Sequence, residues 1–181
     1  MTDASQKHEA VLESRYLYRG RILNLRLDTV AMPSGHQSTR EVVEHSASVA
    51  VVALDDQGNV LLVRQYRLPT QAHELEIPAG EVKPGETPPA AVQRELQEET
   101  GYRAGETQPL GGFYVSPGYC DEYIHLFLAR ELVPSRLAAD ADEELELLRL
   151  PLAEALNLVW QGNIRDAKSI IGLLMAAEKS S

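Results

Sequence analysis

Hydrophobic and polar residues alternate in the first quarter of the chain in the manner of β-strands. The run Ile-Leu-Asn-Leu-Arg-Leu-Asp at residues 22–28 predicts a strand within residues 16–32. A Pro-Ser-Gly turn at residues 33–35 leads to a second strand at residues 39–45. Residues 1–14 are polar, and we expect the start of the chain to be loose. The pattern predicts a small N-terminal antiparallel β element.

The segment that follows is more apolar. Residues 49–54 form a continuous apolar run, and a turn at residues 55–58 joins them to a strand at residues 60–66. We therefore expect a hairpin that is buried on both faces or nearly so.

A glycine-rich loop at residues 79–85 precedes a helix that is predicted over residues 88–100. Thr87 supplies an N-cap, and Pro88 stands at the first helical position, where proline is favoured. Gly101 is typical of the residue that follows a helix C-terminus. The loop and the helix therefore form one continuous unit of the sequence.

The remaining elements are predicted to be short strands and two C-terminal helices. Trp160 and Leu156 are four residues apart on a helix and are expected to pack into the core. Several strands before the first long helix indicate an α+β fold with a mixed sheet, and the lack of GxGxxG after a strand excludes a Rossmann fold. The strands are expected at residues 74–78, 112–115, 123–129 and 147–150, and the helices at residues 152–161 and 166–178.

Charge narrows the partners that the chain can have. The 181 residues carry a formal net charge of −10 and suit one domain with a small appended element. Nucleic-acid binders spread Lys and Arg over one face, so this acidity argues against a nucleic-acid partner. An anionic nucleotide would be repelled unless divalent cations and local arginines screened the acidic groups, which predicts a metal-rich site.

Cysteine usage and hydropathy indicate the compartment. Cys120 is the single cysteine, so the chain can form no internal disulfide. Residues 1–18 lack the apolar run of a signal peptide, and no stretch approaches the ~20 apolar residues of a membrane span. We expect a cytoplasmic protein without a membrane partner.

Three carboxylates crowd the end of the helix predicted over residues 88–100. Glu95 and Glu99 share one side of the helix beside the apolar stripe, and Glu98 lies next to them. Like charges at this spacing destabilise a helix, and burial beside the core removes their hydration. A bound divalent cation would remove that cost, since Mg²⁺ prefers oxygen ligands. A solvated acidic helix face is the alternative interpretation.

The residues around these acids favour the metal site. Gly80 and Glu86 precede the segment Arg-Glu-Leu-Gln-Glu-Glu-Thr-Gly-Tyr at residues 94–102 with the spacing of a Nudix box. The chain thus resembles the Nudix hydrolase family. The resemblance implies a Nudix α/β/α sandwich with a mixed central sheet at residues 46–181, preceded by an N-terminal tail and dimerising strands at residues 1–45.

The resemblance also assigns roles within the box. Two or three Mg²⁺ or Mn²⁺ ions per site would acidify a water and polarise the phosphorus of a diphosphate. Gly80 permits an unusual backbone turn before the helix, and Glu86 pairs with Arg94 to pin the loop. The implied metal ligands are Glu95, Glu98, Glu99 and the carbonyl oxygen of Ala79, and Glu99 is also counted among the catalytic residues.

A further carboxylate is needed to accept the proton of the attacking water. In the related ADP-ribose pyrophosphatases this base lies on an acidic loop late in the chain, and residues 140–146 form such a loop here. The alignment of the following strand makes Glu143 the first choice, with Glu144 or Glu146 next. A loop that only favours solubility is the alternative.

Features outside the box resemble the ADP-ribose pyrophosphatase branch. Pro117 stands fifteen residues beyond Tyr102, and residues 16–25 with residues 40–45 resemble the strands that precede the Nudix fold in that branch. Residues 162–174 resemble a closing helix that nucleoside-diphosphate-sugar hydrolases share. An ordinary turn at Pro117 and ordinary surface strands would explain the first two features as well.

The same resemblance suggests how substrate is held. Arg67 would bind the diphosphate, because a guanidinium offers two parallel hydrogen bonds to phosphate oxygens. In a homodimer whose N-terminal strands reach across, Arg40 or Glu41 would lie beside the substrate of the other subunit. The residues expected to hold the terminal ribose are Ser116, Gly118 and Glu122.

These observations predict an enzyme that hydrolyses ADP-ribose to AMP and ribose 5-phosphate. GDP-mannose or another nucleoside-diphosphate sugar is the alternative substrate. A Nudix-fold module that binds a nucleotide without cleaving it is a rival of another class, and the intact carboxylates argue against it.

Overall fold

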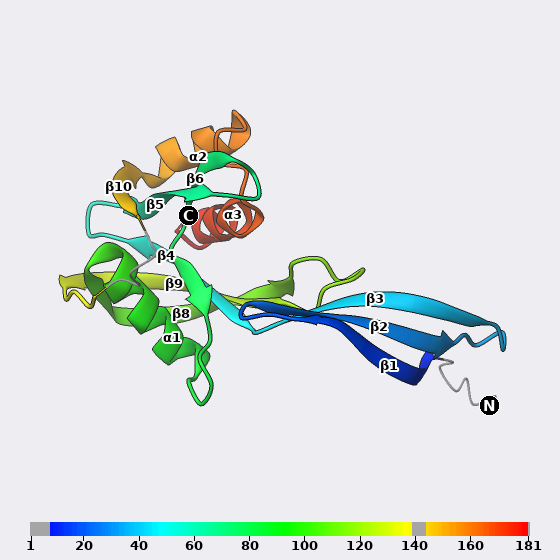
Figure 1. Ribbon diagram of the computed structural model, residues 1–181. Coiled ribbons are helices and arrows are strands. Elements are labelled where there is room, and N and C mark those ends of the chain that lie inside the picture. The colour runs from blue at the N-terminus through cyan, green and yellow to red at the C-terminus, as the bar shows by residue number, and fades with distance from the viewer. Residues whose placement is uncertain (1–7, 139–143, 181) are drawn as a thin grey trace, which may run out of the picture. The chain divides into compact units, whose positions relative to one another are not determined.

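The computed structural model describes residues 8–138 and 144–180 and divides the chain into two compact units (Figure 1). One unit consists of Met1–Ser46 and Tyr114–Glu122, and the other of Ala47–Phe113 and Tyr123–Ser181. Within the described residues, no helix is both long and apolar enough to cross a membrane. The N-terminal unit therefore incorporates a segment from the middle of the chain.

The first unit is built on an antiparallel sheet of order β1-β2-β3. The strand predicted within residues 16–32 corresponds to β2 and the end of β1, and Gly35 turns the chain toward β3 with a φ of 83°. Residues 10–14 belong to β1, so the expectation of a loose start is wrong for them. Every residue of β1 is exposed, so no alternation of burial marks it. The strands are β1 (Ala10–Arg19), β2 (Leu23–Ala31) and β3 (Gln37–His45).

The segment Tyr114–Glu122 joins this unit through backbone hydrogen bonds to the end of β3. The N–H of Val43 donates to the carbonyl of Tyr119 at 2.7 Å, and the N–H of Asp121 donates to the carbonyl of Val43 at 3.1 Å. The Asp121 carboxylate also accepts the N–H of His45 at 2.9 Å. These bonds explain why residues far apart in sequence form one unit.

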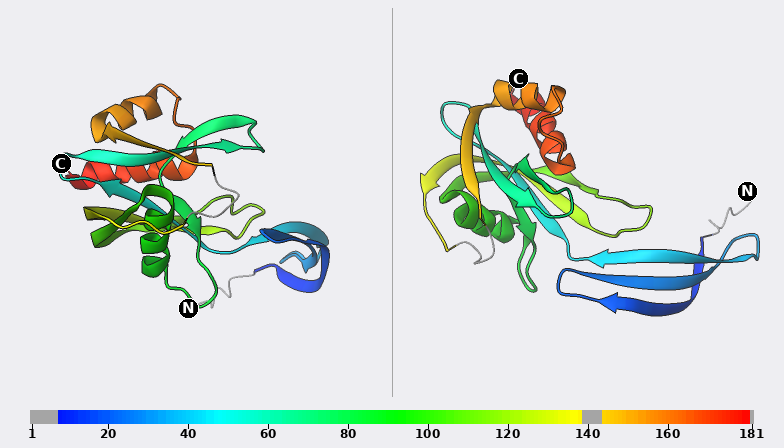
Figure 2. Two further views of the ribbon diagram at one scale, coloured as in Figure 1. Left: turned by 60° about the vertical axis from the view of Figure 1, so that its left-hand side comes forward. Right: turned by 45° about the horizontal axis from the view of Figure 1, so that its top comes forward.

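The second unit contains a mixed sheet of order β10-β5-β4-β9-β8, with β6 paired to β5 and β7 paired to β4 (Figure 2). β4 and β9 run parallel, whereas β5 is antiparallel to β4, β6 and β10. The strands are β4 (Ser48–Leu54), β5 (Asn59–Arg67), β6 (Ala72–Glu76), β7 (Ala79–Glu81), β8 (Tyr102–Tyr114), β9 (Tyr123–Pro134) and β10 (Glu146–Pro151).

Hydrophobic clusters on both faces of this sheet complete an α/β/α sandwich. On one face the odd-numbered residues of β4, such as Val51, pack with α1 (Pro88–Glu95). On the other face the even-numbered residues, such as Val52, pack with α2 (Leu152–Trp160) and α3 (Ala167–Ser180). Every residue of β4 is therefore buried, which explains the continuous apolar run at its position. The fold is α+β, as the sequence predicts.

Some details differ from the sequence-based expectations. β8 extends over Tyr102–Tyr114 and not only over residues 112–115, because it lies at the sheet edge with mostly exposed side chains and shows little apolar patterning. β7 lies within the segment expected to be a glycine-rich loop. Trp160 is 74% exposed at the end of α2, so the prediction that it packs into the core is wrong, whereas Leu156 does pack there.

Candidate active site

The acidic end of α1 lies directly against β7. The carboxylate of Glu95 is so close to Gly80 that a Cβ at this glycine would come within 2.0 Å of Glu95 Oε1. Gly80 has the extended conformation of β7 and not the unusual turn that was expected, so the prediction about its backbone is wrong. Glycine is required here because a backbone and a carboxylate approach each other closely.

The helix ends in a wider turn than predicted. The segment η1 (Leu96–Thr100) is a π-helix, whereas a regular α-helix was expected to residue 100. Gly101 then ends it in the left-handed conformation with a φ of 78°, as its position predicts. π turns occur frequently at functional sites, so this turn favours a functional site at the C-terminal end of the helix.

Two of the helix carboxylates lie against neighbouring residues of β7, Ala79 and Gly80. Glu99 is 6% exposed, and its Oε2 accepts the N–H of Ala79 at 3.2 Å. Glu95 is 8% exposed and lies against Gly80. Both carboxylates are therefore largely removed from water, at positions where an unpaired charge would be costly.

Arg94 is the hub of the ion pairs in this region. Its Nε and Nη2 donate to the two oxygens of Glu86, each at 2.9 Å, and Nη2 also donates to the carbonyl of Glu81 at 2.8 Å. Its Nη1 donates to Glu95 at 2.5 Å and to Glu98 at 2.9 Å. The hydrogen bonds that Arg94 donates to Glu86 above all, with contributions from Glu95 and Glu98, raise the pKa of Arg94 against the opposing effect of burial. The expected pairing of Glu86 with Arg94 ties the loop after β7 to the helix.

The donor chemistry of this region suits a divalent cation. Among the described residues, no three carboxylate, imidazole or thiolate side chains converge closely enough to cage an ion by themselves. Mg²⁺, however, commonly takes one or two carboxylates and completes its coordination with water and substrate phosphate oxygens. The buried carboxylates of Glu95 and Glu99, with Glu98 beside them, fit this requirement.

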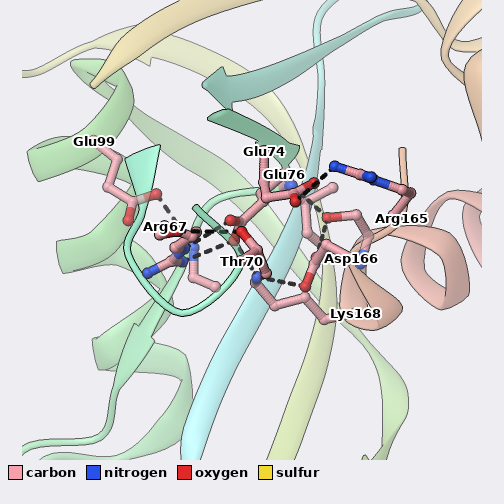
Figure 3. A network of polar contacts seen from close by, with 11 residues as sticks. Arg67, Thr70, Glu74, Glu76, Glu99, Arg165, Asp166 and Lys168 are labelled. Carbon is pink, nitrogen blue, oxygen red and sulfur yellow. Dashed lines mark hydrogen bonds and ion pairs between the residues drawn. The ribbon is translucent and has the colours of Figure 1, made fainter. Parts of the chain in front are cut away.

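Arg67 lies at the end of β5 and is held by an acidic residue on the neighbouring strand (Figure 3). Its Nε and Nη2 donate to the two oxygens of Glu76, each at 2.8 Å. The hydrogen bonds that Arg67 donates to Glu76 chiefly raise the pKa of Arg67, and the negative charges of Asp166 and Glu99 add to the effect. The guanidinium is thus fixed within the electrostatic influence of Glu99.

The other predicted substrate residues lie in the first unit. Arg40 on β3 forms hydrogen bonds of 3.1 and 2.6 Å with the two oxygens of Glu9, and Glu41 beside it is exposed. Ser116 accepts the N–H groups of Tyr119 and Cys120 with its carbonyl oxygen, at 3.0 and 2.9 Å. Arg40 is therefore engaged by a residue of its own chain.

Gly118 and Glu122 belong to the same unit. Gly118 is exposed, and a Cβ there would meet no heavy atom within 4 Å. Glu122 is half-buried, with Oε1 at 3.8 Å from Nδ1 of His45. Both residues are placed by the hydrogen bonds that tie this segment to β3.

Two of the three candidate bases, Glu144 and Glu146, belong to the described residues at the start of β10. Glu143 lies outside the described residues. Glu144 is exposed just before the strand, and Glu146 is the first residue of β10. The carboxylate of Glu146 pairs with Nη1 of Arg64 on β5 at 3.1 Å. Glu146 is thus engaged in a strand-to-strand ion pair.

Comparison with known families agrees with this geometry. Residues 44–171, more than half of the chain, match the NUDIX domain. This chain belongs to the Nudix family. As a Nudix hydrolase it carries its box at residues 80–102, from β7 to the start of β8. Residues 9–43 match a second family, the Nucleoside diphosphate sugar hydrolase N-terminal domain.

Relatives of this Nudix hydrolase share both parts of the chain. It is 39% identical over 163 residues to an ADP-ribose pyrophosphatase of Bacillus subtilis (strain 168), covering 89% of this chain and 88% of that protein. It is 33% identical over 150 residues to a GDP-mannose pyrophosphatase of Yersinia enterocolitica serotype O:8 / biotype 1B, covering 77% and 78%. The crystal structure of an ADP compounds hydrolase matches with a TM-score of 0.87 at 25% identity, covering 98% and 96%.

Sequence reasoning missed the partners of Arg67 in this Nudix domain. Glu76 alternates with Leu75 and Ile77 along the chain, so the pattern of a half-exposed strand would place it in solvent. It is instead 2% exposed. A usable signal was Arg67, which the sequence analysis had already singled out. Acidic residues are almost never fully buried unless they are paired, and Arg67 is the partner that Glu76 has.

Proposed function

We propose that this Nudix hydrolase cleaves the diphosphate of ADP-ribose to AMP and ribose 5-phosphate, with Mg²⁺ or Mn²⁺ as its cofactor. The observation that carries the proposal is the pair of buried carboxylates, Glu95 and Glu99, that lie against Gly80 and Ala79 of β7. Similarity to an ADP-ribose pyrophosphatase over 89% of the chain supports the choice of substrate.

In this proposal the Nudix box supplies the ligands of the metal. Glu95, Glu98, Glu99 and the carbonyl of Ala79 would hold two or three ions. A bound divalent ion would supply charge neutralisation of the diphosphate and a water of lowered pKa. Arg94 keeps the glutamates beside one another, since it donates to both Glu95 and Glu98.

Residues outside the box would complete the reaction. Arg67 would donate to a diphosphate oxygen, and a carboxylate of residues 140–146 would accept the proton of the attacking water. Glu143 is our first choice and Glu144 the second. Glu146 is less suited, because Arg64 already engages it. Water adds to one phosphorus while the bond from that phosphorus to the bridging oxygen breaks, which leaves two monophosphates.

A panel of substrates tests this proposal. The wild-type chain would be incubated with Mg²⁺ and ADP-ribose, ADP-glucose, GDP-mannose, NADH or a diadenosine polyphosphate, and the products identified by chromatography. We expect the highest kcat/KM for ADP-ribose, with AMP and ribose 5-phosphate as products. A higher value for another compound would contradict the substrate assignment while leaving diphosphate hydrolysis intact.

GDP-mannose or a related nucleoside-diphosphate sugar is the second candidate substrate. It is supported by the match of residues 9–43 to the Nucleoside diphosphate sugar hydrolase N-terminal domain and by the 33% identity to a GDP-mannose pyrophosphatase. The same panel separates the two, because GDP-mannose would yield GMP and mannose 1-phosphate.

We also propose that the chain acts as a homodimer through its first unit. β1 is an edge strand, and all of its residues are exposed, including Leu12, Leu17 and Tyr18. An exposed apolar edge strand invites pairing with another chain, and a second copy offers the same surface in return. In that dimer Arg40, Glu41, Ser116, Gly118 and Glu122 would contribute to substrate binding.

The single cysteine is compatible with the cytoplasm as the proposed location.

A further inference from the structure

Glu76 is a carboxylate buried between two cations. It is 2% exposed at the end of β6 and accepts two hydrogen bonds from Arg67 and one from Nζ of Lys168 in the first turn of α3. Burial alone would raise the pKa of Glu76, but the hydrogen bonds and charges of Arg67 and Lys168 outweigh it and hold the pKa below its ordinary value. Glu76 is therefore an anion at neutral pH.

This arrangement fixes one edge of the Arg67 guanidinium. A guanidinium carries its N–H donors in a rigid planar fork, so two parallel bonds to one carboxylate set both its plane and its direction. The Arg67 side chain is 43% exposed, whereas that of Glu76 is 3% exposed. The edge of the guanidinium that carries Nε and Nη2 is thus anchored by Glu76, while a large part of the side chain is exposed.

The first turn of α3 braces the carboxylate from the other side (Figure 3). Lys168 also pairs with Oδ1 of Asp166 at 3.0 Å. The other oxygen of Asp166 accepts the N–H and the hydroxyl of Ser169 at 3.0 and 2.5 Å, and Ser169 Oγ accepts the N–H of Ile77 at 2.8 Å. The two acids and two bases of this group cancel in charge, which lowers the cost of burying the carboxylate of Glu76.

A purely structural role would not require Arg67. Lys168 alone already links Glu76 to α3. Arg67 stands on β5, which is hydrogen-bonded to β6 in the register Arg67↔Ala72, so a side-chain link between these strands adds little. By contrast, the carboxylate of the neighbouring buried Glu74 accepts a hydrogen bond of 2.9 Å from Arg165, and this bond suffices for a structural tie.

We propose that Glu76 is a positioning residue that orients Arg67 for a diphosphate oxygen of the substrate. The inference rests on the proposed function, in which Arg67 contacts the diphosphate. A donor that is oriented in advance loses little freedom on binding, whereas a displacement of about 1 Å at a reacting group can cost about 100-fold in rate. Glu76 thus acts through Arg67 and touches no substrate atom itself.

A double-mutant cycle tests the proposal. Glu76→Gln keeps the shape but places an N–H₂ group against one of the two donors of Arg67, so the guanidinium must rotate. We expect kcat/KM for ADP-ribose to fall by about 10- to 100-fold, mainly through a higher KM. In the Arg67→Ala background, the same substitution should change kcat/KM by less than about 3-fold.

Glu74→Gln is the matched control, since it removes the charge of a buried glutamate two residues away on the same strand. It should lower the melting temperature while leaving kcat/KM unchanged. If Glu76→Gln does not fold, Glu76→Asp replaces it in the cycle, because it retains the charge and shortens the reach by one methylene.

Chemical rescue gives an independent measurement. Millimolar guanidinium ion should restore part of the activity of Arg67→Ala, because the carboxylate of Glu76 can hold the free ion in the position of the missing side chain. It should not restore activity to the double variant with Glu76→Gln. Equal rescue of both variants would overturn the proposal.

The remaining outcomes are equally decisive. An equal fall in kcat/KM in both backgrounds, or no loss on Arg67→Ala alone, would overturn the inference while the wild type still hydrolyses ADP-ribose. Failure of the wild type to hydrolyse any nucleoside diphosphate would instead overturn the proposed function, and this inference with it.

Discussion

Gly80 and Glu95 lie close together in the candidate active site. The carboxylate occupies the space that any side chain at residue 80 would need, with contacts of 2.0 to 2.6 Å to an added Cβ. Nη1 of Arg94 donates to Oε1 of the same carboxylate at 2.5 Å. The position of a proposed metal ligand is therefore set by a glycine on a strand and an arginine on the helix.

Gly80→Ala should displace Glu95. We expect the free energy of unfolding to fall by about 1–3 kcal/mol from overpacking and kcat/KM to fall at least about 10-fold from the misplaced carboxylate. Gly58→Ala is the control, because that glycine has a φ of 78° and open space around it. It should cost about 1 kcal/mol of stability and leave kcat/KM intact. Unchanged kinetics in Gly80→Ala would contradict the role of Glu95.

A second test at a single position concerns the residue that accepts the proton of the attacking water. Glu143→Gln should lower kcat by about 100-fold or more while the Mg²⁺ concentration for half-maximal activity stays the same, because it removes a base and not a metal ligand. Glu144→Gln and Glu146→Gln serve as comparisons in the same assay. A larger loss in either of these would show that the base has been assigned to the wrong glutamate.

The elements of the fold were predictable where burial follows the strand or helix period. β4 was recognised as an apolar run because both of its faces are covered, and Gly101 marked the end of the helix. β1 and most of β8 were missed, because they lie at sheet edges with exposed side chains and therefore carry no alternation.

The candidate site was predictable to a similar degree. The box gave Glu86 and Arg94 as partners, since their spacing is fixed within one segment, and the structure contains that pair. The π turn of η1 and the contact of Glu76 with Lys168, 92 residues apart, depend on tertiary packing, which a local pattern does not encode.

α3 offers a test of the packing that supports the site. Leu173 is fully buried between α3 and the sheet, whereas the adjacent Leu174 is 37% exposed. Leu173→Ala should lower the free energy of unfolding by about 2–5 kcal/mol, and Leu174→Ala by less than about 1 kcal/mol, in urea denaturation. Similar losses for both variants would contradict the orientation of this helix.

The whole molecule combines a Nudix domain with an N-terminal unit that has its own sheet. The exposed apolar residues of β1 are unusual for a surface strand, and contiguous apolar surface commonly marks an interface. A homodimer formed there would use the first unit for assembly and for part of the substrate binding, and the second unit for the metal-dependent chemistry.

Leu17→Glu tests this assembly. It places a charge in the proposed interface and should weaken dimerisation by at least about 10-fold, or about 1.4 kcal/mol, in sedimentation experiments. Leu68→Glu is the control, because Leu68 is 74% exposed in the second unit, and it should leave dimerisation unchanged. A wild type that is monomeric at all concentrations would contradict the proposed dimer.

The central claim is metal-dependent cleavage of ADP-ribose at the Nudix box. Phosphorus NMR measures this cleavage directly. With Mg²⁺ present, the wild type should replace the diphosphate signals with equal signals of AMP and ribose 5-phosphate, and chelation of the metal should stop the reaction. Glu99→Gln should fold normally and react at least about 100-fold more slowly, whereas Glu106→Gln, an exposed control on β8, should react at the wild-type rate. Binding of ADP-ribose by the wild type without any monophosphate signal, in either Mg²⁺ or Mn²⁺, would contradict the account.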